Sequence, residues 1–216
     1  MSSPHLATAS SAVLGAERRV RVARRRTVAA GVLEVTFTCL DPAEVPLAAW
    51  APGAHVDVVL PSGRVRQYSL CGPAQNSGEY VIAVLRETTG RGGSAEVHDR
   101  LPAGTVVAIR GPRDHFRLDH AGHYLFLAGG IGITPILAMA REVAPTGTPW
   151  TLVYGGRTRA SMAYTDELTE LAEISHGSVH LVPQDEHGHP DFAAALRDLP
   201  AGTAVYACGP EAMLQA

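Results

Sequence analysis

The segment Arg66-Gln67-Tyr68-Ser69 has side chains suited to binding a phosphorylated heterocycle. In an extended segment alternate side chains share a face, so Arg66 and Tyr68 can reach two parts of one ligand. A guanidinium donates two parallel, charge-assisted hydrogen bonds to a phosphate, and a tyrosine ring can lie against a heterocycle. Ser69 could then hydrogen-bond a nitrogen of a flavin ring. Taken alone, these residues also fit an edge strand with an exposed arginine and a half-buried tyrosine.

A glycine-rich turn, Gly90-Arg91-Gly92-Gly93-Ser94, favours the phosphate interpretation over an ordinary capped turn. It precedes a short helical run at residues 95–101, for which Ser94 is the expected N-cap. Free N–H groups at a helix start attract anions, and adjacent glycines let a phosphate approach closely. We expect a strand at residues 80–86 to line the same pocket through Ala83, Val84 and Arg86, with Arg86 a second candidate phosphate ligand.

A second glycine turn, Gly129-Gly130-Ile131-Gly132-Ile133-Thr134-Pro135, follows an apolar strand expected at residues 124–128. Thr134 is the expected cap of the next helix and Pro135 its first residue, which is the layout of a dinucleotide-binding turn. Pro135 stands where the third glycine of a GxGxxG motif would be, so the glycines alone are a weak signal. A tight strand-to-helix turn is the alternative interpretation.

Cys208-Gly209-Pro210 follows the last apolar strand of the sequence. Strand ends on one side of a parallel sheet converge on the ligand crevice, so the Cys208 thiol could lie beside a nicotinamide. A cysteine is more often a small buried core residue. Because Gly209 and Pro210 follow it directly, we favour the functional interpretation.

The pattern of turns and apolar runs predicts two domains. Short β-rich runs between residues 19 and 117 favour an antiparallel β-barrel, and apolar strands that alternate with helices after residue 123 favour an α/β domain with a parallel sheet. The expected strands are residues 32–38, 54–60, 80–86 and 105–110, then 124–128, 151–154, 179–182 and 204–208, with later helices at 134–143, 164–174 and 192–199. We predict a disordered tail at 1–17, a flavin-binding barrel at 18–119 and an NAD-binding domain at 120–216.

Composition excludes several classes of protein. The 216 residues carry a net charge of only -3, which argues against a broad basic field for nucleic acid. Six arginines between Arg18 and Arg26 fit the solvated face of a strand better than a docking site. Three cysteines without a CxxC pair indicate neither a disulfide framework nor a metal centre, and they favour a reducing, cytoplasmic setting. No membrane segment is expected, because the uncharged stretch at residues 124–140 is slightly short for a span and is interrupted by three glycines and a proline.

Five segments in this order resemble the ferredoxin reductase superfamily, and within it the phthalate dioxygenase reductase and vanillate demethylase reductase group. They are RQYSLCG, YVIAVLRETTGRGGS, LAGGIGITPILAMA, YTDEL and YACGPEAML, within a similarity that runs from about Arg19 to the last residue. The resemblance implies a flavin barrel followed by an NAD-binding domain. It also implies hydride transfer from a nicotinamide to flavin N5, and then release of single electrons to an iron–sulfur acceptor.

The resemblance also implies roles for individual residues. FMN, in place of the FAD of most relatives, would be held by Arg66, Tyr68, Ser69, Arg86 and the 92–94 turn. Residues 130–135 and 208–210 would flank the nicotinamide and the pyrophosphate, with Thr134 close to the flavin. Ser69 and Cys208 are the residues expected nearest the reacting atoms.

The sequence departs from the family pattern in two places. Relatives usually continue into a final helix and strand and a plant-type ferredoxin domain, so we expect a fragment whose last helix, from Glu211, is cut short and which lacks the cluster ligands. After the second strand of the α/β half, Arg157 and Arg159 could accept the 2′-phosphate of NADPH. Asp185 and Glu186 would repel it, which favours NADH.

The leading hypothesis is therefore an NADH-dependent FMN reductase whose acceptor is a ferredoxin domain or the oxygenase component of a Rieske-type system. One alternative is a FAD-containing NADPH:ferredoxin or flavodoxin reductase, motivated by the two arginines. The other is a non-catalytic flavin- or nucleotide-binding module.

Overall fold

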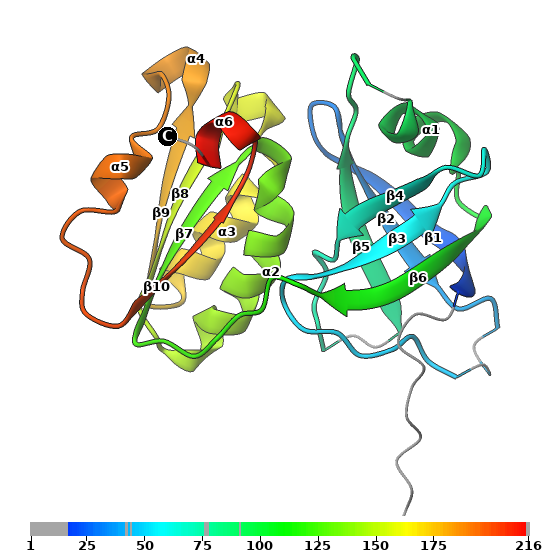
Figure 1. Cartoon of the computed structure of the whole chain (residues 1–216), viewed down its shortest axis with the longest axis horizontal. Helices are drawn as coiled ribbons and strands as arrows, with labels where there is room; N and C mark the ends of the chain where they lie inside the picture. The colour runs from blue at the N-terminus through cyan, green and yellow to red at the C-terminus, as the bar shows by residue number, and fades with distance from the viewer. Residues whose placement is uncertain (1–16, 42, 44, 76–77, 91, 215–216) are drawn as a thin grey trace, which may run out of the picture.

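The computed structural model describes residues 17–41, 43, 45–75, 78–90 and 92–214, so the tail expected at 1–17 lies outside the described residues except for Glu17. The chain forms two lobes, an antiparallel barrel and a parallel sheet covered by helices (Figure 1). This is the fold class predicted from the alternation of turns and apolar runs.

The barrel is a six-stranded sheet, here sheet A, in the order β4-β3-β6-β1-β2-β5. Its strands are β1 (Glu17–Ala29), β2 (Val32–Thr38), β3 (Ala54–Val59), β4 (Val65–Ser69), β5 (Glu79–Leu85) and β6 (Val106–Asp114). A backbone bond from Cys71 N to Val81 O (2.9 Å) joins the chain after β4 to β5 and so brings the two edges of the sheet together. Helix α1 (Gly93–Arg100) lies over one end of the barrel (Figure 1).

Alternation along β1 explains the run of arginines. Val20 and Val22 are fully buried in the barrel core, whereas Arg19 and Arg21 are exposed on the outer face. Successive side chains of a strand point to opposite faces, so Arg19 and Arg21 lie on the solvated side of a core strand, and a register shift between Val22 and Arg24 interrupts this alternation before Arg24, Arg25 and Arg26. Arg26 belongs to the same strand and binds Glu34 of β2.

The second lobe is a four-stranded parallel sheet, here sheet B, in the order β10-β7-β8-β9. Its strands are β7 (His123–Gly129), β8 (Trp150–Gly156), β9 (Gly177–Pro183) and β10 (Thr203–Cys208). The helices are α2 (Ile133–Val143), α3 (Thr165–Glu173), α4 (Gln184–His187), α5 (Phe192–Ala195) and α6 (Glu211–Leu214), with short 3-10 turns at η1 (Gly130–Gly132), η2 (Ala144–Thr146) and η3 (Arg159–Ser161). The helix expected at 192–199 is shorter: it ends at Ala195 with Leu196 as its C-cap, and Asp198 beyond it adopts a left-handed conformation (φ 56°).

Helix α2 lies between sheet B and the barrel (Figure 1), which is why it is apolar on nearly every face. Its Ala138 packs into the barrel core, whereas Ile136 and Leu137 pack into the core of the other lobe. That second core also takes in Val32 and Val81 of the barrel, so the lobes share packed side chains. Within the described part of the chain, no helix is long and apolar enough to cross a membrane.

Candidate functional site

Strand β4 holds Arg66 and Tyr68 on one face, as the alternation predicts. The two residues pair with Val58 and Val56 of β3, and Ser69 pairs with His55. Gln67 is exposed on the opposite face, across from Asp57, so its side chain does not join the other two. Ser69 is half-buried at the end of the strand.

Arg66 lies against the first turn of α1. A methyl group built on Gly93 would come within 2.9 Å of both Cγ and Cζ of Arg66, and it would overlap Nε. Only a glycine therefore lets the guanidinium lie this close to the start of the helix. The structure thus brings together the two features that the sequence suggested as phosphate ligands, an arginine and a helix N-terminus.

Ser94 is not the N-cap of α1, contrary to the prediction. Gly92 occupies the cap in a left-handed conformation (φ 76°), and no side chain caps the helix. Ser94 is already helical, and its Oγ accepts a hydrogen bond from the Glu87 N–H (3.1 Å). Because a helix start has N–H groups without intrahelical partners, this turn suits an anion better than a capped one. Arg91 of the predicted turn lies outside the described residues.

The Tyr68 hydroxyl is buried and has no hydrogen-bond partner within the described part of the chain. Burial raises the pKa of this phenol to about 12, although the Arg66 charge opposes the shift. An unsatisfied buried hydroxyl costs about 1–3 kcal/mol, and a polar group of a ligand would remove that cost. Together with the open helix start beside Arg66, this orphaned hydroxyl fits a phosphorylated flavin.

The other predicted flavin-binding residues, Arg86, Ala83 and Val84, are less well placed to contact a flavin. Arg86 binds Asp99 through two hydrogen bonds (2.7 and 2.9 Å), near the end of α1 remote from Arg66. Ala83 is buried in the core shared by the lobes, and Val84 is buried in the barrel core. The contribution of all three to a flavin site stays a prediction.

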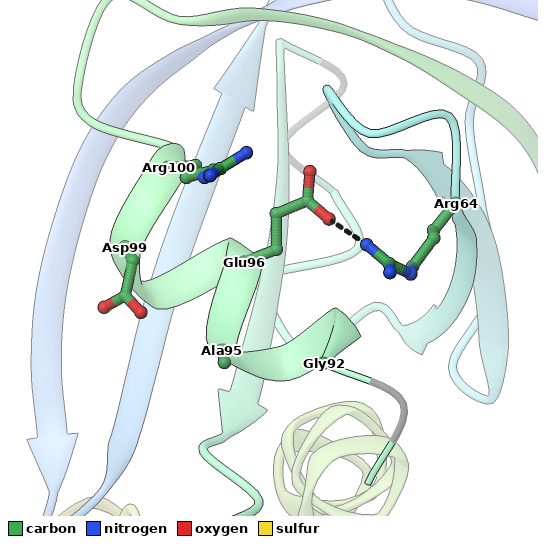
Figure 2. Close-up of a pocket in the computed structure, with 6 residues that line it drawn as sticks. All are labelled: Arg64, Gly92, Ala95, Glu96, Asp99 and Arg100. Carbon is green, nitrogen blue, oxygen red and sulfur yellow. Dashed lines mark hydrogen bonds and ion pairs between the residues drawn. The ribbon is translucent and has the colours of Figure 1, made fainter.

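A hollow of about 250 Å³ lies beside α1. Arg64 and Glu96, which line it, point toward each other (Figure 2). The Glu96 carboxylate is bound by Arg64 (3.4 Å) and by the Ser62 N–H (2.7 Å) and hydroxyl. Burial alone would raise the pKa of Glu96, but the hydrogen bonds from Ser62 and the Arg64 charge outweigh it and leave the pKa below its usual value. Glu96 thereby joins the β3–β4 hairpin to the helix and fixes β4 relative to α1. The sequence signal for it, an acidic residue in a first helical turn, is common and was not singled out.

The glycine turn after β7 forms η1 and leads directly into α2. Gly132 is the N-cap of α2, and no side chain caps it. The prediction that Thr134 caps the helix is therefore wrong: Thr134 is the second helical residue, and its hydroxyl donates to Ile131 O (3.0 Å). Pro135 is the third helical residue, where its missing N–H still costs no intrahelical bond.

The glycine turn and the 208–210 segment pack against each other at the carboxyl ends of β7 and β10, which are adjacent in sheet B. A methyl group on Gly132 would overlap the Cys208 carbonyl oxygen and come within 2.8 Å of Gly209 N. One on Gly129 would come within 2.9 Å of Pro210 Cδ. The convergence expected of a parallel sheet is present. Cys208 is half-buried there, and burial raises the pKa of its thiol.

Tyr154, at the end of β8, supports the glycine turn and was not singled out from the sequence. Its hydroxyl donates to Gly130 O (3.2 Å) and accepts from the Ala163 N–H (3.1 Å). Burial raises the pKa of this phenol, so it remains a donor. In the sequence Tyr154 looks like any aromatic residue of a buried strand.

The two arginines after β8 differ in their surroundings. Arg159 forms an ion pair with Glu186 of α4 (3.3 Å), whereas the exposed Arg157 has no ion-pair partner among the described residues. The Asp185 N–H donates to Arg157 O (3.2 Å), which joins the ends of β8 and β9. In the described part of the chain, no group of three or more His, Cys, Asp or Glu side chains could hold a metal ion. His187 and His189 therefore belong to no such group.

Comparison with known proteins agrees with this geometry. Residues 126–216 match the oxidoreductase NAD-binding domain family. The chain is 44% identical over 184 residues to phenoxybenzoate dioxygenase subunit beta of Ectopseudomonas oleovorans, covering 83% of this chain and 56% of that protein. It is 36% identical over 202 residues to phthalate dioxygenase reductase of Burkholderia cepacia, covering 91% and 61%.

A solved structure of phthalate dioxygenase reductase, described as modular for electron transfer from pyridine nucleotides to [2Fe-2S], superposes with a TM-score of 0.82 at 35% identity. The match covers 92% of this chain and 62% of that one. As its motifs predicted, the chain is similar in sequence and in fold to the phthalate dioxygenase reductase group of the ferredoxin reductase superfamily. It spans 56% and 61% of the length of the two curated relatives.

Within the ferredoxin reductase fold, the predicted site residues fall into two groups that the structure assembles separately. Arg66 approaches Gly93 at the start of α1, where Gly92 is the N-cap, and Tyr68 lies on the same face of β4 as Arg66. The 130–135 turn and the 208–210 segment meet where β7 and β10 end. The residues that hold each group in place, Glu96 and Tyr154, act through long-range hydrogen bonds.

Proposed function

We propose that this chain is the flavin- and pyridine-nucleotide-binding part of an NADH-dependent reductase that passes electrons through FMN to the iron–sulfur acceptor of a Rieske-type aromatic oxygenase or demethylase. The observation that supports this most is Arg66 against the uncapped start of α1, with the orphaned hydroxyl of Tyr68 two residues away. One site then offers a phosphate ligand and a ring-binding face.

The protein's own residues would bind and orient. Arg66 and the first N–H groups of α1 would bind the flavin phosphate, and Tyr68 would lie along the ring with its hydroxyl paired. Ser69 would hydrogen-bond the ring edge, and residues 130–135 with 208–210 would hold the nicotinamide coenzyme. When bound, a flavin supplies the conversion of a two-electron hydride into single electrons, and the protein contributes positioning.

The charges after β8 and β9 support NADH over NADPH. Glu186 offsets Arg159 by an ion pair, and Asp185 adds a second carboxylate nearby, so a 2′-phosphate would meet little net positive charge. Arg157 favours NADPH, because its side chain is exposed and has no ion-pair partner within the described part of the chain. A FAD- and NADPH-dependent reductase is therefore the second candidate.

One set of experiments separates the candidates. The protein is reconstituted with FMN or FAD, the retained flavin is identified by chromatography, and its anaerobic reduction by NADH and by NADPH is followed by stopped-flow absorbance. We expect FMN to be retained and NADH to reduce it at least tenfold faster. Retention of FAD with faster reduction by NADPH would support the second candidate. A protein that binds flavin but is not reduced by either coenzyme would be the non-catalytic module.

We also propose the electron acceptor of this protein and the cellular compartment in which it works. The relatives named above are a dioxygenase subunit and a dioxygenase reductase, which supports a ferredoxin domain or an oxygenase component as acceptor. All three cysteines are free thiols, which supports a reducing, cytoplasmic environment.

A further inference from the structure

Tyr164, at the start of α3, has a strained backbone and lies at the contact between the two lobes. It is 7% exposed and adopts a left-handed conformation (φ 63°), which is uncommon for a bulky residue. Such a conformation costs about 1–3 kcal/mol and persists only where the surroundings hold it. The contacts of the Tyr164 side chain must therefore hold its backbone in this conformation.

The Tyr164 hydroxyl reaches across to the barrel. It donates to Glu34 Oε2 of β2 (2.9 Å), and Glu34 is itself bound by Arg26 of β1 through two hydrogen bonds (3.1 and 3.0 Å). The same hydroxyl lies 3.7 Å from the Cys71 sulfur. A hydrogen bond to a carboxylate is stronger than one between neutral groups, and this carboxylate is already oriented by the arginine.

A second connection converges on Cys71. Arg141 of α2 donates to the Cys71 carbonyl oxygen and forms an ion pair with Glu167 of α3. Cys71 comes two residues after Ser69, and α2 begins at the glycine turn. Tyr164 and Arg141 therefore join the chain after the proposed flavin strand to the helices that follow the proposed dinucleotide turn.

We infer that Tyr164 is a positioning residue that, through Glu34 and Cys71, sets the spacing between the flavin strand and the dinucleotide turn. This inference depends on the proposed function, because the spacing matters only if hydride passes between groups bound at the two places. Hydride transfer requires the reacting atoms about 3–3.5 Å apart, and a misplacement of 1 Å can slow such a step about 100-fold.

The first test needs neither flavin nor coenzyme. Cys71 is 1% exposed, and burial raises the pKa of its thiol to about 12, so we expect iodoacetamide at pH 8 to alkylate it very slowly. Alkylation is located by mass spectrometry of peptides. Tyr164→Phe and Glu34→Gln should each speed alkylation of Cys71 at least fivefold. Tyr80→Phe is the matched control, because its hydroxyl donates to Ala48 O (2.6 Å) inside the barrel lobe and its loss should leave Cys71 protected.

The second test is stopped-flow reduction of the flavin-loaded protein at saturating NADH. Each of Tyr164→Phe and Glu34→Gln should lower the reduction rate constant about 5- to 20-fold, with the Kd for NADH and for FMN changed less than twofold. The double variant should be no slower than the slower single one, because both substitutions act on the same contact, Tyr164→Phe by removing the donor and Glu34→Gln by weakening the acceptor. Fully additive losses, unchanged alkylation, or faster alkylation with an unchanged rate constant would each overturn the inference.

The two tests also separate this inference from the proposed function. If NADH and NADPH both fail to reduce the flavin in the unaltered protein, the proposed function is wrong, and alkylation of Cys71 alone decides whether Tyr164 holds the lobes together. Glu34→Gln keeps the shape of the side chain, so the alkylation rate of Cys71 can be measured in this variant even if Tyr164→Phe fails to fold.

Discussion

At the scale of single residues, two incomplete polar arrangements mark the flavin side of the site. Tyr68 has a buried hydroxyl without a partner in the described part of the chain. Arg66 lies against the start of α1, and among the described residues its guanidinium donates one hydrogen bond, to the neighbouring Val65 O. Proteins rarely leave buried polar groups unsatisfied, so such groups indicate where a ligand belongs. Arg86, by contrast, is already satisfied by Asp99. Arg66 is therefore the residue whose loss should weaken flavin binding most.

Replacing Arg66 by alanine should raise the free energy of FMN binding by about 1.5–3 kcal/mol, the range for a hydrogen bond to a charged group. The measurement is quenching of flavin fluorescence during titration of the flavin-free protein. Arg21→Ala is the matched control, since Arg21 is an exposed arginine on the outer face of β1. An affinity that falls equally in both variants, or in neither, would contradict a phosphate contact at Arg66.

At the scale of elements, the strands were predictable and the helix caps were not. Strands such as β2 and β10 follow from apolar runs bounded by turn residues, and the structure has them within a residue of the predicted ends. Ser94 and Thr134 were expected as N-caps because their hydroxyls suit that position. In the structure the N-cap of α1 is Gly92 and the N-cap of α2 is Gly132. The contacts that fix β4 against α1 were not predictable, because Glu96 and Ser62 meet only through the tertiary fold.

Gly132→Ala tests the packing of the two turns at the ends of β7 and β10. The added methyl group would overlap the Cys208 carbonyl oxygen, so the glycine turn must shift. We expect a loss of about 1–3 kcal/mol in the free energy of unfolding, the usual cost of overpacking, measured by urea denaturation. We also expect at least a fivefold higher Kd for NADH.

Gly122→Ala is the control for that substitution, because Gly122 has nothing within 4 Å of an added methyl group. If Gly132→Ala leaves both stability and coenzyme binding at the values of this control, the two turns are not held by close backbone contact.

At the scale of the whole molecule, the decisive feature is the contact between the lobes. Val32, Cys71 and Val81 of the barrel pack into the same core as Phe126 and Ile136 of the α/β lobe. The sequence shows two patterns and a boundary between them, but it does not show which faces meet, because that depends on the placement of α2 and α3. The bonds from Arg141 and Tyr164 to Cys71 are part of this contact and were absent from any sequence pattern.

A shared core should make the two lobes unfold together. We expect differential scanning calorimetry of the flavin-free protein to show one transition, with the calorimetric and van't Hoff enthalpies equal. FMN at 100 times its Kd should add about 2.7 kcal/mol to the free energy of unfolding if it binds only the folded chain. For a chain of this length that is a rise of about 5–10 °C in Tm. Arg66→Ala at the same FMN concentration should show a smaller rise. Two separated transitions, of which FMN shifts only one, would mean that the lobes are independent and that the contacts of Cys71 do not couple them.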